Sequence, residues 1–240
     1  MSYSENPYQS PVWGRLAVNA EADERTDFIR KTYLHLGGAV MAFIAIEAIL
    51  VRLPIGAELV NLMMAQRFSW VILMLAFVGV SFLSEKWARS TTSVATQYAG
   101  LSLYVVAESI IFLPILLIAD RFYPGVIPQA GMATGVLFGG LTLIVFLTGH
   151  DFSYLRTILW FGGLASILLV LWAVLSNHSL GIPFSIAMIA LAGGWILYDT
   201  SNVMKHYRIG QHVAASLALF ASVAILFYYI LRLLMQLNRR

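Results

Sequence analysis

The sequence predicts an all-α polytopic membrane protein, a bundle of seven transmembrane helices. Two observations lead to this class. First, 60% of the 240 residues are hydrophobic and only 11% are charged, whereas soluble domains carry about 25% charged residues. The mean hydropathy is accordingly high, at +0.79. Second, the apolar residues gather in seven segments, each near the ~20 residues with which a helix crosses the hydrocarbon core of a bilayer.

The apolar segments follow one another closely, and each is expected to form one spanning helix. In chain order they cover residues 34–53, 68–84, 94–119, 127–148, 154–176, 182–203 and 213–237. Short connections favour antiparallel neighbours in a compact bundle, and neither a Gly/Ser-rich linker nor an internal repeat divides the chain. We therefore expect one transmembrane domain over residues 34–240, surrounded by the lipid bilayer.

The stretch before the first span, residues 1–33, is polar and contains five acids and two prolines. A signal peptide would need a basic start followed at once by a short apolar core, whereas here the first apolar run begins near Leu34. We expect a flexible cytoplasmic tail, with at most a helical turn over residues 27–33 beside the membrane.

Lysines and arginines predict the orientation, because cytoplasmic loops are enriched in them. Nine flank the spans on the N-terminal side and five on the other side, with Arg232 inside the last span. The nine are Arg15, Arg25, Arg30, Lys31, Lys86, Arg89, Arg156, Lys205 and Arg208, and the five are Arg52, Arg67, Arg121, Arg239 and Arg240. This distribution predicts an integral protein of the cell or inner membrane with a cytoplasmic N-terminus and, after an odd number of spans, an external C-terminus.

Glycines at intervals of four mark one face of the fourth span: Gly131, Gly135 and Gly139. Small residues at this spacing let another helix backbone approach closely. We therefore expect this face, like the Gly162-Gly163 and Gly193-Gly194 pairs, to pack against a neighbouring helix.

Three carboxylates lie inside the spans: Glu47, Glu108 and Asp199. An ionised acid in hydrocarbon costs several kcal/mol, so such a group faces the bundle interior, finds a partner or stays protonated. For Glu47 and Glu108 the alternative to an ion pathway is a protonated acid hydrogen-bonded to a neighbouring helix. For Asp199 the alternative is an interfacial residue beside Lys205.

The last two spans form a hairpin whose loop centres near Gly210. In an antiparallel pair, a residue ten or eleven positions before that centre lies level with one about twelve positions after it. Asp199 is therefore expected to face Ser222, and a hydroxyl there could satisfy the buried acid.

Other classes of function lack their signatures. The chain has no cysteine, which excludes disulfides and thiolate chemistry. It also lacks the zinc-binding His-Glu-x-x-His, the nucleophile elbow Gly-x-Ser-x-Gly and a phosphate-binding glycine loop, while His206 and His212 alone fall short of a metal site. No basic stripe with interleaved aromatics indicates nucleic acid. We expect a protein that is not an enzyme and has no cofactor, metal site or nucleic-acid partner.

Four stretches carry a resemblance to a known family. They are FIRKTY at 28–33, TGHDFSYL at 148–155, ILYDT at 196–200 and LFYYILRLL at 226–234. Together they span about 200 residues in order, on a plan of seven spans. The chain resembles the Bax inhibitor-1 family, also called transmembrane Bax inhibitor motif proteins.

The resemblance implies six helices around the seventh and a pH-sensitive leak of calcium or other cations, controlled by two aspartates on the last two helices. Asp199 matches the first aspartate. The second belongs ten residues before Arg232, where this chain has Ser222. The family's basic partner at the end of the second helix has no clean match, and Arg89 and Lys86 are the nearest candidates.

Two functions therefore stand against each other. The first is a channel or exchanger for calcium or protons, with Asp199 at the gate and Ser222, Glu108 and Glu47 along the pathway. The second is a non-conducting regulator that binds other membrane proteins, such as a protease or a component of stress or cell-death pathways. Two coupled carboxylates share one proton and titrate as a pair, which one acid beside a hydroxyl cannot reproduce, so Ser222 adds weight to the second function.

Overall fold

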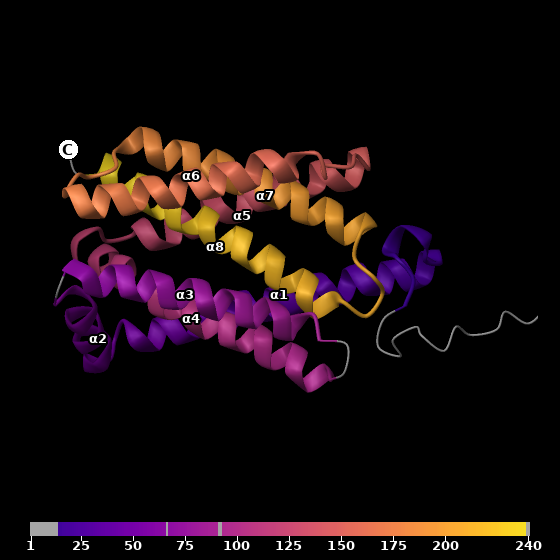
Figure 1. The fold of residues 1–240 in the computed structure, drawn as a ribbon, viewed down its shortest axis with the longest axis horizontal. Helices are drawn as coiled ribbons and strands as arrows, with labels where there is room; N and C mark the ends of the chain where they lie inside the picture. The colour runs from indigo at the N-terminus through magenta and orange to yellow at the C-terminus, as the bar shows by residue number, and fades with distance from the viewer. Residues whose placement is uncertain (1–13, 66, 91–92, 239–240) are drawn as a thin grey trace, which may run out of the picture.

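A computed structural model describes residues 14–65, 67–90 and 93–238, and secondary structure over these residues is helical apart from one isolated bridge. Seven of the helices are long and apolar enough to cross a membrane (Figure 1). They are α1 (Ala22–Leu50), α3 (Arg67–Ala88), α4 (Val94–Phe122), α5 (Val126–Thr148), α6 (Leu155–Ser176), α7 (Ile182–Lys205) and α8 (His212–Leu237). The predicted all-α, seven-span class is confirmed.

Helix α1 begins at Ala22, well before the first predicted span, and has 29 residues. Asp23 and Glu24 lie in its first turn, where negative charge interacts favourably with the helix dipole. One turn further, Lys31 pairs with Asp27 at 2.7 Å, an i, i+4 pair that supports a helix. The expectation of a flexible tail up to residue 33 is therefore wrong for residues 22–33, because charge patterning extends the helix beyond its apolar part.

The residues just before α1 are also ordered against the rest of the chain. Gly14 and Ala17 donate backbone N–H bonds of 2.8 Å to the carbonyls of Ile209 and Tyr207, and Ile209 donates one of 2.9 Å to Arg15. A short 3-10 turn, η1 (Ala17–Asn19), then leads into α1. This segment closes over the loop between α7 and α8, and residues 1–13 of the expected tail lie outside the described part of the chain.

A short helix between the first two spans, α2 (Pro54–Met64), is not predicted by the hydropathy pattern. With 11 residues it is about 16 Å long, too short to cross a bilayer. Pro54 opens it, a position where the missing N–H is harmless. Figure 1 shows α2 at the end of the bundle away from the α7–α8 loop.

Helix α8 occupies the centre of the bundle. It packs against α7, α1, α5, α4 and α3, whereas α6 packs on α7 in the outer layer, and Figure 1 shows α8 crossing between α3 and α7. The ring of Phe43 in α1 lies 5.1 Å from that of Phe112 in α4 and 6.0 Å from that of Phe220 in α8. α8 buries the largest share of its residues among the spans, so it forms the core.

The glycine face of α5 does not pack within this chain. Gly131, Gly135 and Gly139 are exposed, and a Cβ added at any of them would meet nothing within 4 Å. The expectation of a helix contact there is wrong, because spacing shows that a face is small but not which way it turns.

Other glycines do mediate close contacts. A Cβ at Gly162 in α6 would meet Leu191 Cδ1 of α7 at 2.7 Å, and one at Gly194 in α7 would meet Leu159 Cδ2 of α6 at 2.7 Å. Each leucine thus fills the space above the other helix's glycine. A Cβ at Gly193 would also meet Leu141 Cδ1 of α5, at 3.4 Å, whereas one at Gly163 would meet nothing within 4 Å, so the predicted packing holds at both residues of the second pair and at one of the first.

The orientation of the bundle is a testable prediction. Arg232 donates a 2.8 Å hydrogen bond from Nη2 to the carbonyl of Leu180, at the opposite end from the α7–α8 loop, and so belongs to the side that the charge count predicts to be external. A reporter that is active only outside the cytoplasm, fused after Arg240, is expected to be active. The same reporter inserted after Ile209 is the control and should be silent. Activity in the reverse pattern would contradict the charge count.

Candidate functional site

The α7–α8 hairpin brings Asp199 and Ser222 together. Ser222 Oγ donates a 2.5 Å hydrogen bond to Asp199 Oδ2, and the two residues are 3% and 7% exposed respectively. The hairpin can close because Gly210 adopts a φ of +98°, a conformation that glycine reaches without strain. The contact predicted from the loop position is present, and Asp199 is a buried residue with a partner, not an interfacial one.

Asp199 and Ser222 lie in the wall of a cavity of about 530 Å³. It is bounded by α3 on one side, by α6 and α7 on the other and by α8 at its floor. A second cavity, of about 470 Å³, lies toward the α7–α8 loop and is lined by polar side chains. The two share Arg89, Arg156, Tyr198, Asn202 and Tyr207, so they adjoin and together form a passage, polar at the loop end of the bundle, that leads to Asp199.

Arg89 lines both cavities of this passage, as Arg156 does, whereas Lys86 lines neither. The Arg89 guanidinium does not pair directly with Asp199. It binds Glu85 Oε1 through both Nε and Nη2 at 3.0 Å and lies 5.7 Å from the centre of the Tyr207 ring. Of the two sequence candidates for a basic partner, the geometry therefore favours Arg89.

Tyr207 is a residue of the site that motif reasoning missed. It is 6% exposed and lines both cavities, next to Arg89. Burial raises the pKa of its phenol, and the charge of Asp199 acts in the same direction, so the phenol stays protonated. No sequence pattern marks Tyr207, because it lies in a loop. Tyr198 and Asn202 could have been found, since they share the face of α7 that carries Asp199.

Glu108 and Glu47 lie elsewhere. Glu108 is 4% exposed, and its Oε1 accepts a 2.9 Å hydrogen bond from Tyr104 Oη. The hydrogen-bond partner was expected on a neighbouring helix, whereas Tyr104 lies one turn away on the same helix. Glu47 is 5% exposed, and neither of its carboxyl oxygens has a hydrogen-bond partner among the described residues. Neither glutamate lines the passage to Asp199, although Tyr104 does.

The loop between α5 and α6 closes the site from the side. Asp151 Oδ1 accepts bonds of 2.9 Å from the Ser153 N–H and 3.4 Å from Ser201 Oγ, while Oδ2 lies 3.6 Å from His206 Nε2. Burial would raise the pKa of Asp151, but the bonds from Ser153 and the charges of His206 and Lys205 outweigh it and lower the pKa. At pH values above the ordinary pKa of the Asp151 carboxyl group, the ionised acid therefore helps to hold this loop on α7. This contribution is lost as the pH falls through the lowered pKa of Asp151.

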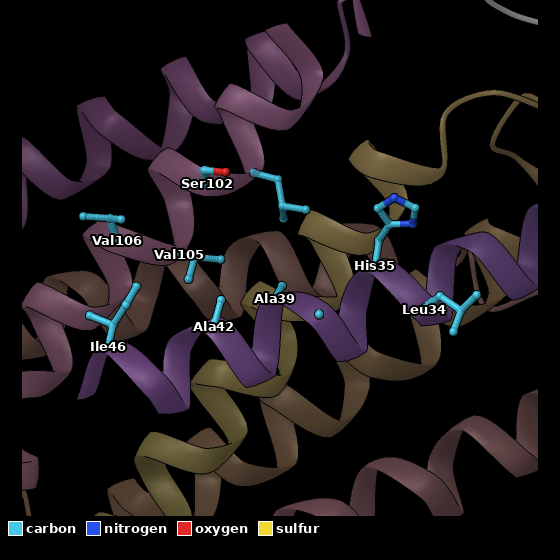
Figure 2. A pocket seen from close by; sticks show the side chains of 10 residues that line it. Leu34, His35, Ala39, Ala42, Ile46, Ser102, Val105 and Val106 are labelled. Atoms are coloured by element: carbon cyan, nitrogen blue, oxygen red, sulfur yellow. The ribbon is translucent and has the colours of Figure 1, made fainter. Parts of the chain in front are cut away.

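A further cavity, of about 460 Å³, lies between α1 and α4 (Figure 2). Its lining is almost entirely apolar, with residues such as Ala42, Ile46 and Val106, and His35 stands at one end. His35 Nε2 is 2.7 Å from Tyr98 Oη. Because no acid lines this cavity, it is not a candidate for the ion pathway.

His206 and His212, at the two ends of the α7–α8 loop, have different neighbours. His206 faces Asp151, and the His212 ring lies 4.8 Å from the ring of His35. Within residues 14–65, 67–90 and 93–238 no three His, Asp or Glu side chains gather into a group able to hold a metal ion.

Comparison with known proteins places this geometry in a family. The family model described as "Inhibitor of apoptosis-promoting Bax1" matches residues 25–239. The chain belongs to the Bax inhibitor-1 family. Its Asp199–Ser222 pair and the passage that leads to it are therefore features of one member of that family.

Among the similar proteins are three from Arabidopsis thaliana. A BI1-like protein is 31% identical over 122 residues, 46% of this chain and 45% of that protein. Protein LIFEGUARD 1 is 32% identical over 113 residues, 44% of this chain and 47% of that protein. In both, the match spans about half the length of the relative. Protein LIFEGUARD 3 is 26% identical over 235 residues, 93% of this chain and 90% of that protein.

Proposed function

We propose that this Bax inhibitor-1 family protein carries cations, calcium or protons, across the membrane as a leak channel or exchanger, with Asp199 as the binding or gating acid. One observation carries the proposal: a buried carboxylate lies in the wall of a passage that begins at a polar mouth at one end of the bundle. Acids inside membrane spans mark ion pathways, because their burial is costly.

The contact between Asp199 and Ser222 would act as the closure. The Ser222 hydroxyl donates a hydrogen bond to Asp199 Oδ2, and this bond joins α7 to α8 beneath the passage. A cation that binds Asp199 competes with this hydrogen bond. Tyr104 of α4 also lines the cavity, and its hydroxyl donates a hydrogen bond to Glu108. Tyr104 therefore lies between the passage and Glu108, a second buried acid.

The alternative is a non-conducting regulator that binds another membrane protein, such as a protease or a stress or cell-death component. Two observations favour it. Ser222 cannot ionise, so the pair lacks the second titrating group, and the passage mouth carries Arg156, whose positive charge opposes the entry of cations.

Asp199→Asn tests the proposal. In liposomes that contain only the purified protein, we expect the fold to be kept and the calcium or proton flux to fall about tenfold or more, because the charge that binds the cation is lost. Asp120→Asn at the exposed end of α4 is the matched control and should leave flux unchanged. If the unaltered protein, in a verified orientation, shows only the flux of empty liposomes at acidic and neutral pH, the conducting function is excluded and a stoichiometric protein partner should be sought.

A further inference from the structure

The mouth of the passage contains a cation without a protein partner. Arg156 lines both cavities and is exposed, and among the described residues its guanidinium has no ion pair. Of the neighbouring charges, Arg89 pairs with Glu85, and the Asp151 carboxylate lies beside His206 and interacts with the charge of Lys205. The mouth therefore carries a guanidinium with no ion-pair partner among the described residues, beside the polar side chains of Ser153, Asn202 and Gln211.

The cavity that contains Asp199 becomes apolar away from this mouth and opens sideways. Phe82 of α3 and Trp160 of α6 both line it and are 71% and 61% exposed, and Val78 is 42% exposed. Residues that line a cavity while remaining this exposed form its rim at the lipid-facing surface. These rim residues place the opening between α3 and α6.

Both walls present the same order of groups. On α6, Trp160 lies four residues beyond Arg156, about 6 Å deeper. On the α3 side, Phe82 lies seven residues before Arg89, about 10 Å deeper. A basic group at the membrane surface with aromatic groups one or two turns below it matches a molecule that has an anionic head and an apolar tail.

We infer that this groove binds an anionic phospholipid from the leaflet at the α7–α8 loop end, with its phosphate on Arg156 and an acyl chain along Phe82 and Trp160. Charge complementarity decides the headgroup: Arg156 needs an anion, and guanidinium binds phosphate with two charge-assisted hydrogen bonds. The leaflet is the one that the charge count predicts to be cytoplasmic. The site lies beside Asp199 but does not depend on ion transport.

Native mass spectrometry of the purified protein tests this inference with dioleoyl phosphatidylglycerol, dioleoyl phosphatidylcholine and inorganic phosphate. We expect phosphatidylglycerol to bind more tightly than phosphatidylcholine, and Arg156→Gln to weaken it about tenfold. Arg208→Gln, an exposed arginine at the same end that does not line the groove, is the matched control and should bind like the wild type. Trp160→Ala should weaken the binding of both lipids, because it removes the contact with the acyl chain.

Equal binding of the two lipids, or unchanged binding in Arg156→Gln, would overturn the inference. Displacement of phosphatidylglycerol by millimolar inorganic phosphate would also overturn it, since the mouth would then be a site for a soluble anion. Asp199→Asn separates this inference from the proposed transport. It should alter flux but leave phosphatidylglycerol binding as in the wild type.

Discussion

Replacing Ser222 with aspartate is expected to make the α7–α8 contact strongly dependent on pH. Ser222 Oγ lies 2.5 Å from Asp199 Oδ2, so the new carboxyl group would face Asp199 directly. Two ionised carboxylates about 4 Å apart repel each other by about 4 kcal/mol at an effective dielectric constant of 20. At moderate pH one of the two must therefore hold a proton. The contact should persist while that proton is shared and weaken when it is lost as the pH rises.

Hydrogen exchange of residues 206–211 and ion flux, each followed from acidic to weakly alkaline pH, would measure this response. Ser222→Asn is the control, because it adds a similar volume without a charge. Adding Asp199→Asn to Ser222→Asp should remove the response, since coupling needs both acids and the double mutant isolates the pairwise part. A folded Ser222→Asp protein with the same pH profile as Ser222→Asn would show that the two groups do not share a proton.

Gly100→Ala is expected to destabilise the bundle by about 1–3 kcal/mol, the usual range for overpacking. The added Cβ would lie 2.6 Å from the Ser84 carbonyl oxygen and 2.7 Å from the Ala88 nitrogen. Both atoms belong to the backbone of α3, so the clash cannot be relieved by a rotamer change and the two helices must move apart.

Thermal unfolding in mild detergent would measure the effect, with an expected fall in Tm of roughly 5 °C. Gly135→Ala is the matched control, because nothing lies within 4 Å of a Cβ there, and it should leave Tm unchanged or slightly higher. Loss of stability in Gly135→Ala but not in Gly100→Ala would reverse the assignment of the close helix contacts.

The prediction for these glycines differs between sequence and structure for a physical reason. The four-residue spacing of Gly131, Gly135 and Gly139 shows that one face of α5 is small, but in a membrane both lipid and a neighbouring helix are apolar surroundings. Hydropathy therefore does not say which way the face turns. Gly100 carries no such pattern, and only the approach of α3 reveals its role.

The buried acids show which side-chain contacts residue spacing along the helices can predict. Asp199 and Ser222 could be paired from the sequence because both helices rise evenly from a short loop, so depth follows from counting residues. The bond from Tyr104 to Glu108 also follows helical spacing, at i and i+4, yet nothing in the sequence ranks it above a partner on another helix.

By itself the sequence determined the fold class, the seven spans, the family and the pairing of Asp199 with Ser222, because each depends on local hydropathy or on distance along a helix. The tertiary structure alone decided that residues 14–17 lie against the α7–α8 loop and that Arg89, Arg156 and Tyr207 surround one passage. These features depend on the rotation of each helix about its axis and on contacts between segments far apart in the chain. In a bilayer that rotation is set by side-chain packing and hydrogen bonds between helices, which no single segment encodes.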